Sequence, residues 1–346
     1  MIQPVQIGRR MVGPGHKPFI IAEACINHEG NFEMARKMVH VAHAMGADCI
    51  KFQIHILENE MLREAPQSEN FDEPLYDTLE KTNLSVDEHR KLKALCEQLG
   101  IFYLCTPFSR DGADILEEIG VEAFKTGSGE LTNLPLQEHI ARKGKPMIVS
   151  TGMCTEEEVA ETVSLIQGIG TPLILTHCVS AYPTPYRIVN LGMIRKYADR
   201  FQVPVGLSDH SRGIYTALGA VPYGACVLEK HFTLDKMRGG PDNPVSIEPG
   251  ELAELVKGAD AIFQAMGEER RIFEEEKQIV AWARESVVTE KPIKKGTVIT
   301  REMVWVKRPG PGPGAIPAKD LKKVIGKTAL ADIPKDQQLL WSHVGR

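Results

Sequence analysis

Three pairs of polar residues follow apolar runs of the chain, and the two members of each pair are separated by one residue. The pairs are Lys51 with Gln53, Ser208 with His210, and Glu229 with His231. Side chains of a strand alternate between its two faces, so residues two apart point to the same side. Each run is therefore expected to direct two reactive groups into one shared space. We interpret that space as an active site.

His210 and His231 end consecutive apolar runs, so their imidazole rings could bind one divalent metal ion together. No cysteine or carboxylate stands at a matching position, and such a site would keep coordination places open for water and a substrate oxygen. The alternative is that both are hydrogen-bonded histidines at the rim of the fold. Spacing alone leaves both interpretations open.

Lys51 and Lys125 close two of the runs, and hydroxyl groups lie at or near the ends of neighbouring ones. These hydroxyl-bearing residues are Thr106, Ser128, Ser150 and Ser208. Two cations among hydroxyls and the backbone amides of Gly127 and Gly129 suit a substrate that carries phosphate and carboxylate. The alternative is that one buried lysine forms a Schiff base with a carbonyl substrate. Two lysines beside a metal site favour anion binding.

Glu23 and Glu229 add carboxylates to the same ends of the runs. Either could act as a general acid or base if burial raises its pKa. The alternative for each residue is a simple ion pair with a lysine.

Eight short apolar runs, rich in Val, Ile, Leu or Phe, must position these groups. They are Phe19–Glu23, Cys49–Gln53, Phe102–Thr106, Ala123–Thr126, Met147–Thr151, Leu173–His177, Val205–His210 and Val227–His231. The pattern predicts strands that are buried on both faces. Helices are expected between them, from an N-cap at Asn31 to a stop at Gly46, after the capping boxes Ser85/Glu88 and Thr155/Glu158, and at 110–119, 133–142, 188–197, 211–220 and 249–266.

Eight strand–helix units in about 250 residues predict an α/β fold of the (β/α)₈ (TIM) barrel type, whose chemistry lies at the carboxyl ends of the strands. An open, doubly wound sheet is the competing prediction, but it would not need a polar residue at the end of every strand. The segment 54–84 is longer than an ordinary strand-to-helix loop, and we interpret it as a lid or substrate loop.

The 346 residues exceed one barrel, so a second unit is expected. We predict a barrel over residues 1–268, a charged linker at 269–284 and a small domain at 285–346. Short strand-like pieces (Ser286–Val288, Thr297–Ile299 and Val304–Val306) and a Pro-Gly loop that follows Arg308 give the last segment its loop-rich character.

Composition excludes several classes of function. A net charge of −5 provides no broad basic surface, which argues against a nucleic-acid partner. No apolar run has the length of a membrane span, and the N-terminus lacks the apolar segment of a signal peptide. The seven scattered cysteines are interpreted as reduced core residues of a cytoplasmic protein, with Cys178 only a weak candidate nucleophile.

Ordered motifs along nearly the whole chain resemble the bacterial sialic acid (N-acetylneuraminate) synthases. They are Ile-Ala-Glu at 21–23, Ile-Asn-His-Glu-Gly at 26–30, Lys-Phe-Gln at 51–53, Thr-Pro-Phe-Ser at 106–109, Lys-Thr-Gly-Ser-Gly-Glu at 125–130, Ser-Thr-Gly-Met at 150–153, Tyr-Pro-Thr-Pro at 182–185, Gly-Leu-Ser-Asp-His at 206–210 and Glu-Lys-His-Phe-Thr at 229–233. The pieces Val-Lys-Arg-Pro-Gly at 306–310 and Ile-Gly-Lys at 325–327 resemble the antifreeze-like (SAF, β-clip) domain of that family.

The resemblance implies that phosphoenolpyruvate condenses with the aldehyde of an N-acetylmannosamine-type amino sugar, giving a nine-carbon keto acid and phosphate. It implies Mn²⁺, or another divalent metal, on His210 and His231, and a glutamate near the reacting carbons at Glu23. Phosphoenolpyruvate would be held by Lys51, Thr106, Lys125, Ser128, Ser150 and Ser208. The sugar would be contacted by Gln53, Tyr182, Asp242 and, across a domain-swapped homodimer, Arg308.

Ser180 departs from the pattern, because bacterial N-acetylneuraminate synthases commonly carry asparagine two residues before the motif tyrosine. Serine there also resembles the animal synthases and those of legionaminic and pseudaminic acids, which use phosphorylated or diacetamido sugars. The stretch from His55 to Met61 resembles the N-acetylneuraminate group, so we expect that acceptor and keep a diacetamido hexose as the alternative.

Two rival functions need different tests. A metal-dependent pyruvate aldolase would share the barrel and both histidines but would release no phosphate. A non-catalytic carbohydrate-binding or ice-binding protein built on the small domain would leave the polar strand ends without a purpose.

Overall fold

The computed structural model describes residues 2–64, 73–238 and 240–345. The chain forms two compact units, Met1–Gly267 and Glu268–Arg346. Each unit has its own buried core and is described by itself. Among the described residues, no helix is both long enough and apolar enough to cross a membrane.

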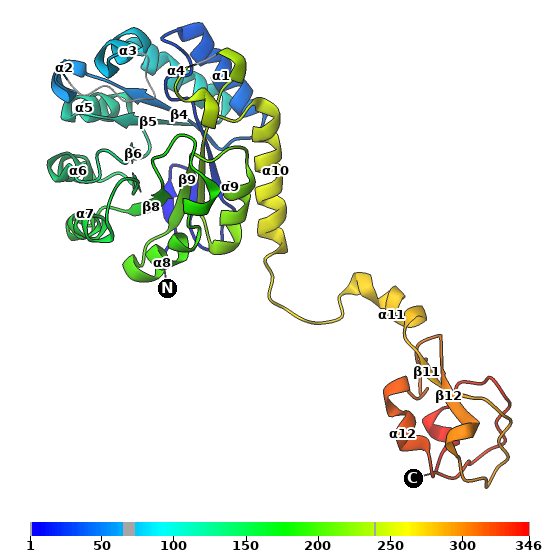
Figure 1. Ribbon diagram of the computed structural model, residues 1–346. Helices are drawn as coiled ribbons and strands as arrows, with labels where there is room; N and C mark the ends of the chain where they lie inside the picture. Colours follow the sequence, from blue (N-terminus) through cyan, green and yellow to red (C-terminus); the bar gives the residue numbers. More distant parts are fainter. Residues whose placement is uncertain (1, 65–72, 239, 346) are drawn as a thin grey trace. The chain divides into compact units, whose positions relative to one another are not determined.

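Eight parallel strands form the barrel of the first unit (Figure 1). They are β3 (Phe19–Glu23), β4 (Cys49–Ile54), β5 (Phe102–Pro107), β6 (Phe124–Thr126), β7 (Met147–Ser150), β8 (Leu173–Cys178), β9 (Val205–Asp209) and β10 (Val227–His231). They are hydrogen bonded in the order β5-β4-β3-β10-β9-β8-β7-β6, and β5 lies beside β6 without strand pairing between these two fully described strands. The predicted (β/α)₈ barrel is confirmed, and the alternative of an open, doubly wound sheet is wrong.

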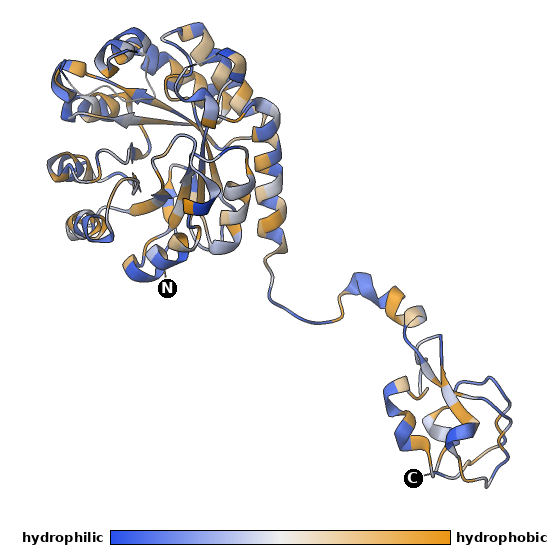
Figure 2. Cartoon of the chain, viewed as in Figure 1, coloured by the Kyte–Doolittle hydropathy of each residue, from blue (hydrophilic) through white to orange (hydrophobic). Residues whose placement is uncertain are grey.

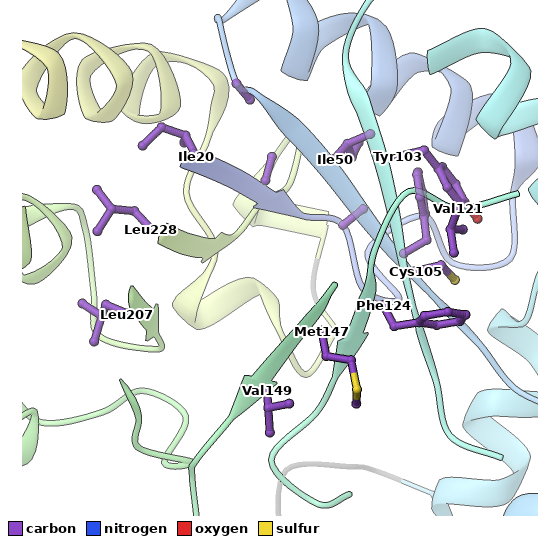
Figure 3. Close-up of a cluster of buried hydrophobic side chains, with 14 of the residues drawn as sticks. Ile20, Ile50, Tyr103, Cys105, Val121, Phe124, Met147, Val149, Leu207 and Leu228 are labelled. Carbon is purple, nitrogen blue, oxygen red and sulfur yellow. The ribbon is translucent and has the colours of Figure 1, made fainter. Parts of the chain in front are cut away.

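Alternate strand residues pack outward against the helices and form the largest apolar cluster of the barrel (Figure 3). Figure 3 labels ten of its members: Ile20, Ile50, Tyr103, Cys105, Val121, Phe124, Met147, Val149, Leu207 and Leu228. A second cluster fills the barrel interior with Phe19, Ile21 and Phe102, and the hairpin β1 (Val5–Ile7) and β2 (Arg10–Val12) contributes to it. The interior near the amino ends of the strands is therefore packed, and the carboxyl ends are left for polar groups.

The main barrel helices mix hydrophilic and hydrophobic residues, as amphipathic helices do (Figure 2). They are α1 (Phe32–Ala44), α4 (Val86–Leu99), α5 (Arg110–Ile119), α6 (Leu134–Ala141), α7 (Glu156–Ile169), α8 (Gly192–Phe201), α9 (Tyr215–Ala220) and α10 (Pro249–Ala265). The Asn31 side chain caps α1, and both predicted capping boxes form.

Two helices begin later than we predicted. The helix expected at 188–197 is α8, which starts at Gly192, because the chain first makes a short 3-10 turn at Tyr186–Ile188 and passes through a left-handed residue, Asn190. The helix expected at 211–220 is α9, which starts at Tyr215, because Gly213 also has a positive φ of 67°.

The long segment after β4 contains two short helices, α2 (Leu57–Glu60) and α3 (Leu75–Thr82). Leu57, Tyr76 and Leu79 form a small apolar cluster with Cys25 and Ile26, which follow β3. Part of the predicted lid, residues 65–72, lies outside the described residues. The role of the segment as a lid stays a prediction.

The second unit contains α11 (Lys277–Ala283), a two-stranded antiparallel sheet of β11 (Ser286–Thr289) and β12 (Val304–Lys307), and α12 (Leu321–Val324). Its core includes Val287, Ile316 and Leu339. We expected a strand at Thr297–Ile299. In the structure this piece forms only one isolated bridge, between Val298 and Thr328. The stretch 269–284, which we predicted as a linker, includes α11.

Candidate active site

A cavity of about 650 Å³ opens at the carboxyl ends of the barrel strands. Fourteen of the fifteen predicted site residues line it: Glu23, Lys51, Gln53, Thr106, Lys125, Ser128, Ser150, Ser180, Tyr182, Ser208, His210, Glu229, His231 and Asp242. All three pairs with a spacing of two residues are among them, as the strand period predicts. Arg308, the remaining residue, belongs to the second unit.

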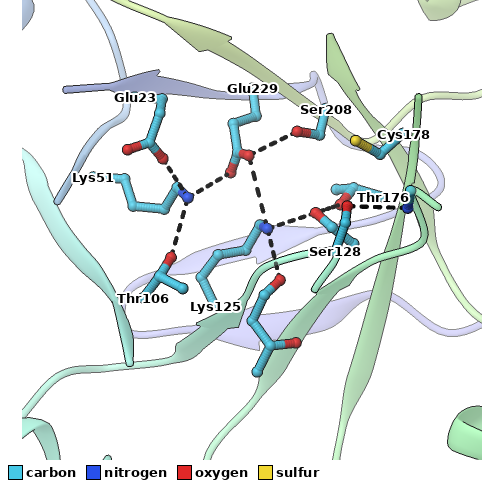
Figure 4. A network of polar contacts seen from close by, with 12 residues as sticks. Glu23, Lys51, Thr106, Lys125, Ser128, Thr176, Cys178, Ser208 and Glu229 are labelled. Carbon is cyan, nitrogen blue, oxygen red and sulfur yellow. Dashed lines mark hydrogen bonds and ion pairs between the residues drawn. The ribbon is translucent and has the colours of Figure 1, made fainter. Parts of the chain in front are cut away.

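Lys51 lies between two buried carboxylates (Figure 4). Its Nζ makes a close ion pair with Glu23, lies 3.6 Å from Glu229 Oε2 and donates a 3.2 Å hydrogen bond to Thr106 Oγ1. Strand register explains part of this arrangement, because Lys51 pairs with Glu23 across β4 and β3.

Lys125 lies near the other carboxylate oxygen of Glu229 (Figure 4). Its Nζ lies 3.7 Å from Glu229 Oε1 and donates hydrogen bonds to Ser150 Oγ at 2.6 Å and to the Thr126 carbonyl at 2.9 Å. Ser208 donates to the same Glu229 oxygen at 2.8 Å. Glu229 therefore links both lysines in one network.

Burial and charge separate the pKa values of the two glutamates. Burial raises the pKa of Glu23 to about 7, because desolvation outweighs the attraction of Lys51 and the charge of Glu229 adds to the rise. Burial also acts on Glu229, but Lys125 and Lys51 together outweigh it and lower its pKa to about 2. Glu229 is thus a permanent anion, and Glu23 can gain or lose a proton near neutral pH.

The two predicted metal-binding histidines lie side by side, with ring centroids 5.2 Å apart. His210 has partners at both nitrogens, the Val179 carbonyl at 3.0 Å from Nδ1 and the Tyr182 hydroxyl at 3.1 Å from Nε2. His231 Nδ1 is buried and has no hydrogen-bond partner among the described residues.

Strand-end positions alone predicted two histidines as ligands, and the folded chain adds a carboxylate and a thiol beside His231. Asp242 places a carboxylate oxygen 3.7 Å from His231 Nδ1, and Cys25 brings its thiol to the same place. The ligand atoms of Cys25, His231 and Asp242 all lie within 4.8 Å of one another. Cys25 and Asp242 lie in loops, after β3 and β10 respectively. A prediction that considers only residues at the ends of strands therefore misses them.

Further cavity residues also escaped the sequence prediction of the site. Glu130 is an acid whose Oε2 is buried without a partner among the described residues, and burial raises its pKa to about 7. His55 joins Glu60 to Gln53, with Nδ1 2.9 Å from a Glu60 oxygen and Nε2 3.2 Å from Gln53 Oε1. Gln53 and His55 are two apart, so extending the strand period by one residue would have found His55.

Gly152 allows two serines to approach the backbone at the rim of the cavity. Its N–H donates to Ser128 Oγ at 3.0 Å, and a side chain at position 152 would overlap with Ser128 and Ser180. The hydroxyl group of Ser180 and that of Ser128, which is one of the predicted anion contacts, therefore both lie beside the backbone of Gly152.

Sequence models of two known families match this chain. Residues 38–271 match the NeuB family, and residues 284–345 match the SAF domain. The chain belongs to the NeuB family. It is an enzyme of the sialic acid synthase type, which condenses phosphoenolpyruvate with a sugar.

Named members of the NeuB family resemble the chain over nearly its full length. It is 36% identical to the N,N'-diacetyllegionaminic acid synthase of Legionella pneumophila, over 94% of either chain. It is 34% identical to the human N-acetylneuraminate-9-phosphate synthase, over 96% of this chain and 94% of the human one. A crystal structure of the N-acetylneuraminic acid synthetase of Leptospira borgpetersenii matches with a TM-score of 0.72 and 33% identity, over 81% of this chain and 96% of that one.

Proposed function

We propose that the enzyme joins phosphoenolpyruvate to the open-chain aldehyde of an N-acetylmannosamine-type sugar and releases an N-acetylneuraminate-type nine-carbon keto acid and phosphate. The observation that carries the proposal is the cavity at the strand ends, where two lysines and four hydroxyl-bearing residues lie opposite two histidines. The first group suits an anion, and the second suits the oxygen of an aldehyde.

Lys51 and Lys125 bind the phosphate and carboxylate of phosphoenolpyruvate in this proposal. Glu23 and Glu229 balance the charges of these lysines within the chain. An entering anion takes over the contact between Lys51 and Glu23, and the released Glu23 is free to accept a proton. The Thr106 and Ser150 hydroxyls already point at the lysine ammonium groups and complete the anion site.

A divalent metal ion, Mn²⁺ by the family resemblance, fits the other side of the cavity. The buried and unpartnered Nδ1 of His231 is suited to a ligand, and His210 lies beside it. His210 and His231 would hold the ion, which when bound polarises the sugar aldehyde and stabilises the charge that develops on its oxygen. The Val179 carbonyl keeps His210 oriented by accepting a hydrogen bond from Nδ1, and Nε2 would exchange its contact with the Tyr182 hydroxyl for the ion.

Glu23 holds the exchangeable proton in this mechanism, because its pKa of about 7 lets it act in either direction. The methylene carbon of phosphoenolpyruvate forms the new bond to the aldehyde carbon, and the aldehyde oxygen takes a proton from Glu23. Water then adds to the carbon that carries phosphate and returns one proton to Glu23. Phosphate leaves with the second water proton as the carbon–oxygen bond breaks and the ketone forms. No step of this mechanism uses a lysine imine, and Lys51, whose pKa is raised by Glu229 and Glu23 against the effect of burial, stays an ammonium ion.

A second candidate acceptor is a diacetamido hexose. Ser180 favours it, because serine is smaller than asparagine and leaves room for a second acetamido group. The resemblance to the Legionella synthase supports the same candidate. The chemistry at the lysines and histidines would be unchanged.

A phosphate-release screen tests the proposed reaction. The purified protein would receive phosphoenolpyruvate, Mn²⁺ and, one at a time, N-acetylmannosamine, its 6-phosphate and a diacetamido hexose. We expect phosphate with one of the sugars, and no keto acid product when pyruvate replaces phosphoenolpyruvate. In a second experiment, phosphoenolpyruvate would carry a heavy-oxygen label in the position that bridges carbon and phosphorus. The label should appear in the released phosphate, and label kept in the keto acid would contradict carbon–oxygen cleavage.

Ser180 is expected to influence the choice of acceptor. Ser180→Asn fills space at the cavity rim beside Ser128 and adds an amide group, so the ratio of kcat/KM for N-acetylmannosamine and a diacetamido hexose should change by about 1–3 kcal/mol. Ser164→Asn, on the exposed face of α7, is the control and should leave the ratio unchanged. An unchanged ratio in Ser180→Asn would show that this residue does not select the sugar.

Arg308 is proposed to act on the sugar across a head-to-tail homodimer, as the family resemblance implies. Arg308→Ala should lower kcat/KM about 10- to 100-fold, the loss expected for a hydrogen bond from a charged donor. The control is Arg301→Ala, because Arg301 stacks on Trp305 much as Arg308 stacks on Trp282. Mixed dimers of Arg308→Ala and His231→Ala chains should regain activity, since one of their two sites is intact. Mixed dimers, proven by mass, that stay inactive would contradict action across the dimer.

A further inference from the structure

Cys25 has an unusual backbone for its residue type. Its φ of 45° lies in the left-handed region, which residues with a side chain seldom adopt. It follows β3 by two residues, and its N–H donates a 2.7 Å hydrogen bond to Glu23 Oε1. The conformation places a buried thiol on the wall of the active-site cavity.

The thiol lies next to a nitrogen that has no partner. The Cys25 sulfur, a His231 ring nitrogen and an Asp242 oxygen are within 4.8 Å of one another, and all three residues are buried. The His231 side chain is 9% exposed, and its Nδ1 finds no hydrogen-bond partner in the described part of the chain. A buried ring nitrogen without a partner is costly unless a ligand completes it.

We propose that Cys25 is a ligand of the active-site metal, bound as a thiolate together with His231 and Asp242. This inference rests on the metal site of the proposed function and specifies its chemistry. On binding, the thiol loses its proton to solvent and the sulfur donates an electron pair to the ion. His210, at the neighbouring strand end, can join these ligands when Nε2 gives up its contact with the Tyr182 hydroxyl.

The distances suit such a site after a small contraction. Ligand atoms around a tetrahedral zinc ion lie roughly 3.5 Å apart, given metal–ligand bonds of about 2.0–2.3 Å. His231 Nδ1 and Asp242 Oδ2 are already 3.7 Å apart. The sulfur needs to approach the other two ligand atoms by about 1.3 Å at most, from 4.8 Å to roughly 3.5 Å, which is within reach of a side-chain rotation.

A thiolate changes which metal the site prefers. Sulfur ligands favour Zn²⁺ and similar softer ions, whereas Mn²⁺ favours oxygen ligands. The site should therefore bind Zn²⁺, Co²⁺ or Fe²⁺ more tightly than Mn²⁺, and this preference should weaken when Cys25 is replaced. Removal of the sulfur should reduce the preference for Zn²⁺ over Mn²⁺ by about 10- to 100-fold, a loss typical of disturbed metal sites.

Cobalt provides the test, because a thiolate bound to Co²⁺ gives a charge-transfer absorption in the near ultraviolet. Metal-free full-length protein would be titrated with Co²⁺ as wild type, Cys25→Ser, Cys25→Gly and Cys178→Ala. We expect the absorption in wild type and in Cys178→Ala, and its loss in both Cys25 variants. Cys25→Gly is expected to fold at least as well as wild type, because glycine accepts the left-handed backbone.

Cys178 is the matched control because it is a second buried cysteine of the same cavity, with its sulfur 3.7 Å from His210 Nδ1. Loss of the absorption in Cys178→Ala, with retention in Cys25→Gly, would assign the sulfur to Cys178 and overturn the inference. Wild type that binds Co²⁺ with visible bands alone would overturn the Cys25 inference and leave the metal site standing. Wild type that binds no Co²⁺ would overturn both.

Discussion

Replacement of His231 by alanine should leave a folded barrel whose turnover no longer responds to metal and is slower on the order of a thousandfold. The activity falls because a metal-held stabilisation of the aldehyde oxygen is lost. The fold survives because Nδ1 of His231 makes no hydrogen bond within the described chain and the residue lies at a strand end, beyond the packed interior. Metal content after dialysis and turnover with and without chelator provide the measurement.

His177 is the control for this substitution. It is also a buried strand histidine with an unpartnered Nδ1, but its Nε2 contacts the Val189 carbonyl at 2.7 Å and it does not line the cavity. His177→Ala should retain metal and most of the activity while losing some thermal stability. A His231→Ala protein that keeps wild-type turnover after chelation and repurification would refute the metal assignment.

Lys51→Met should abolish most activity, whereas Lys230→Met should mainly destabilise the fold. Lys51 faces the cavity, and loss of its contact with an anionic substrate should lower kcat/KM for phosphoenolpyruvate on the order of 100-fold, given about 1.5–3 kcal/mol for a hydrogen bond to a charged group. Lys230 is equally buried but points away from the cavity and pairs with Asp209 at 3.2 Å. Its removal leaves the buried Asp209 carboxylate without its ion pair and should cost about 3–5 kcal/mol of stability.

The folding cost of Lys51→Met should depend on pH. Without Lys51, burial still keeps the pKa of Glu23 above the ordinary pKa of glutamate. Between these two pKa values, Glu23 is protonated in the folded state and ionised in the unfolded state, so the stability of the fold decreases with rising pH. When Glu23 loses its proton, its negative charge repels that of Glu229. The stability of the fold therefore falls as the pH rises through neutrality. Thermal unfolding at mildly acidic and mildly alkaline pH measures this, and equal losses at both would contradict the assignment of the proton to Glu23.

The sequence predicted the site best where strand geometry controls direction. The alternation of side chains alone placed Gln53, Ser208 and Glu229 on the cavity wall, and the apolar residues between them predicted the strands. Loops follow no such period. Cys25 and Glu130 lie in turns whose backbone angles and long-range contacts decide where the side chains point, so their positions follow only from the folded chain.

The start of α8 shows the same limit. Its apolar period continued upstream in the sequence, yet the left-handed Asn190 stopped the helix from extending in that direction. Asp242 was expected at the site only through family resemblance, since nothing in its local sequence indicates a contact with His231. Position in a loop, rather than residue type, limited each of these predictions.

We expect a bound anion to stabilise the barrel where β5 and β6 meet. These neighbouring strands share no hydrogen-bonded ladder, and the proposed phosphate contacts lie on both sides of the join, Lys51 and Thr106 on one and Lys125 and Ser150 on the other. A bound anion would link β5 and β6, which are not joined to each other by backbone hydrogen bonds. Phosphoenolpyruvate at a hundredfold excess over its Kd stabilises the fold by about 2.7 kcal/mol, and amide hydrogen exchange should slow most in β5 and β6. Protection spread evenly around the barrel would contradict a local bridge.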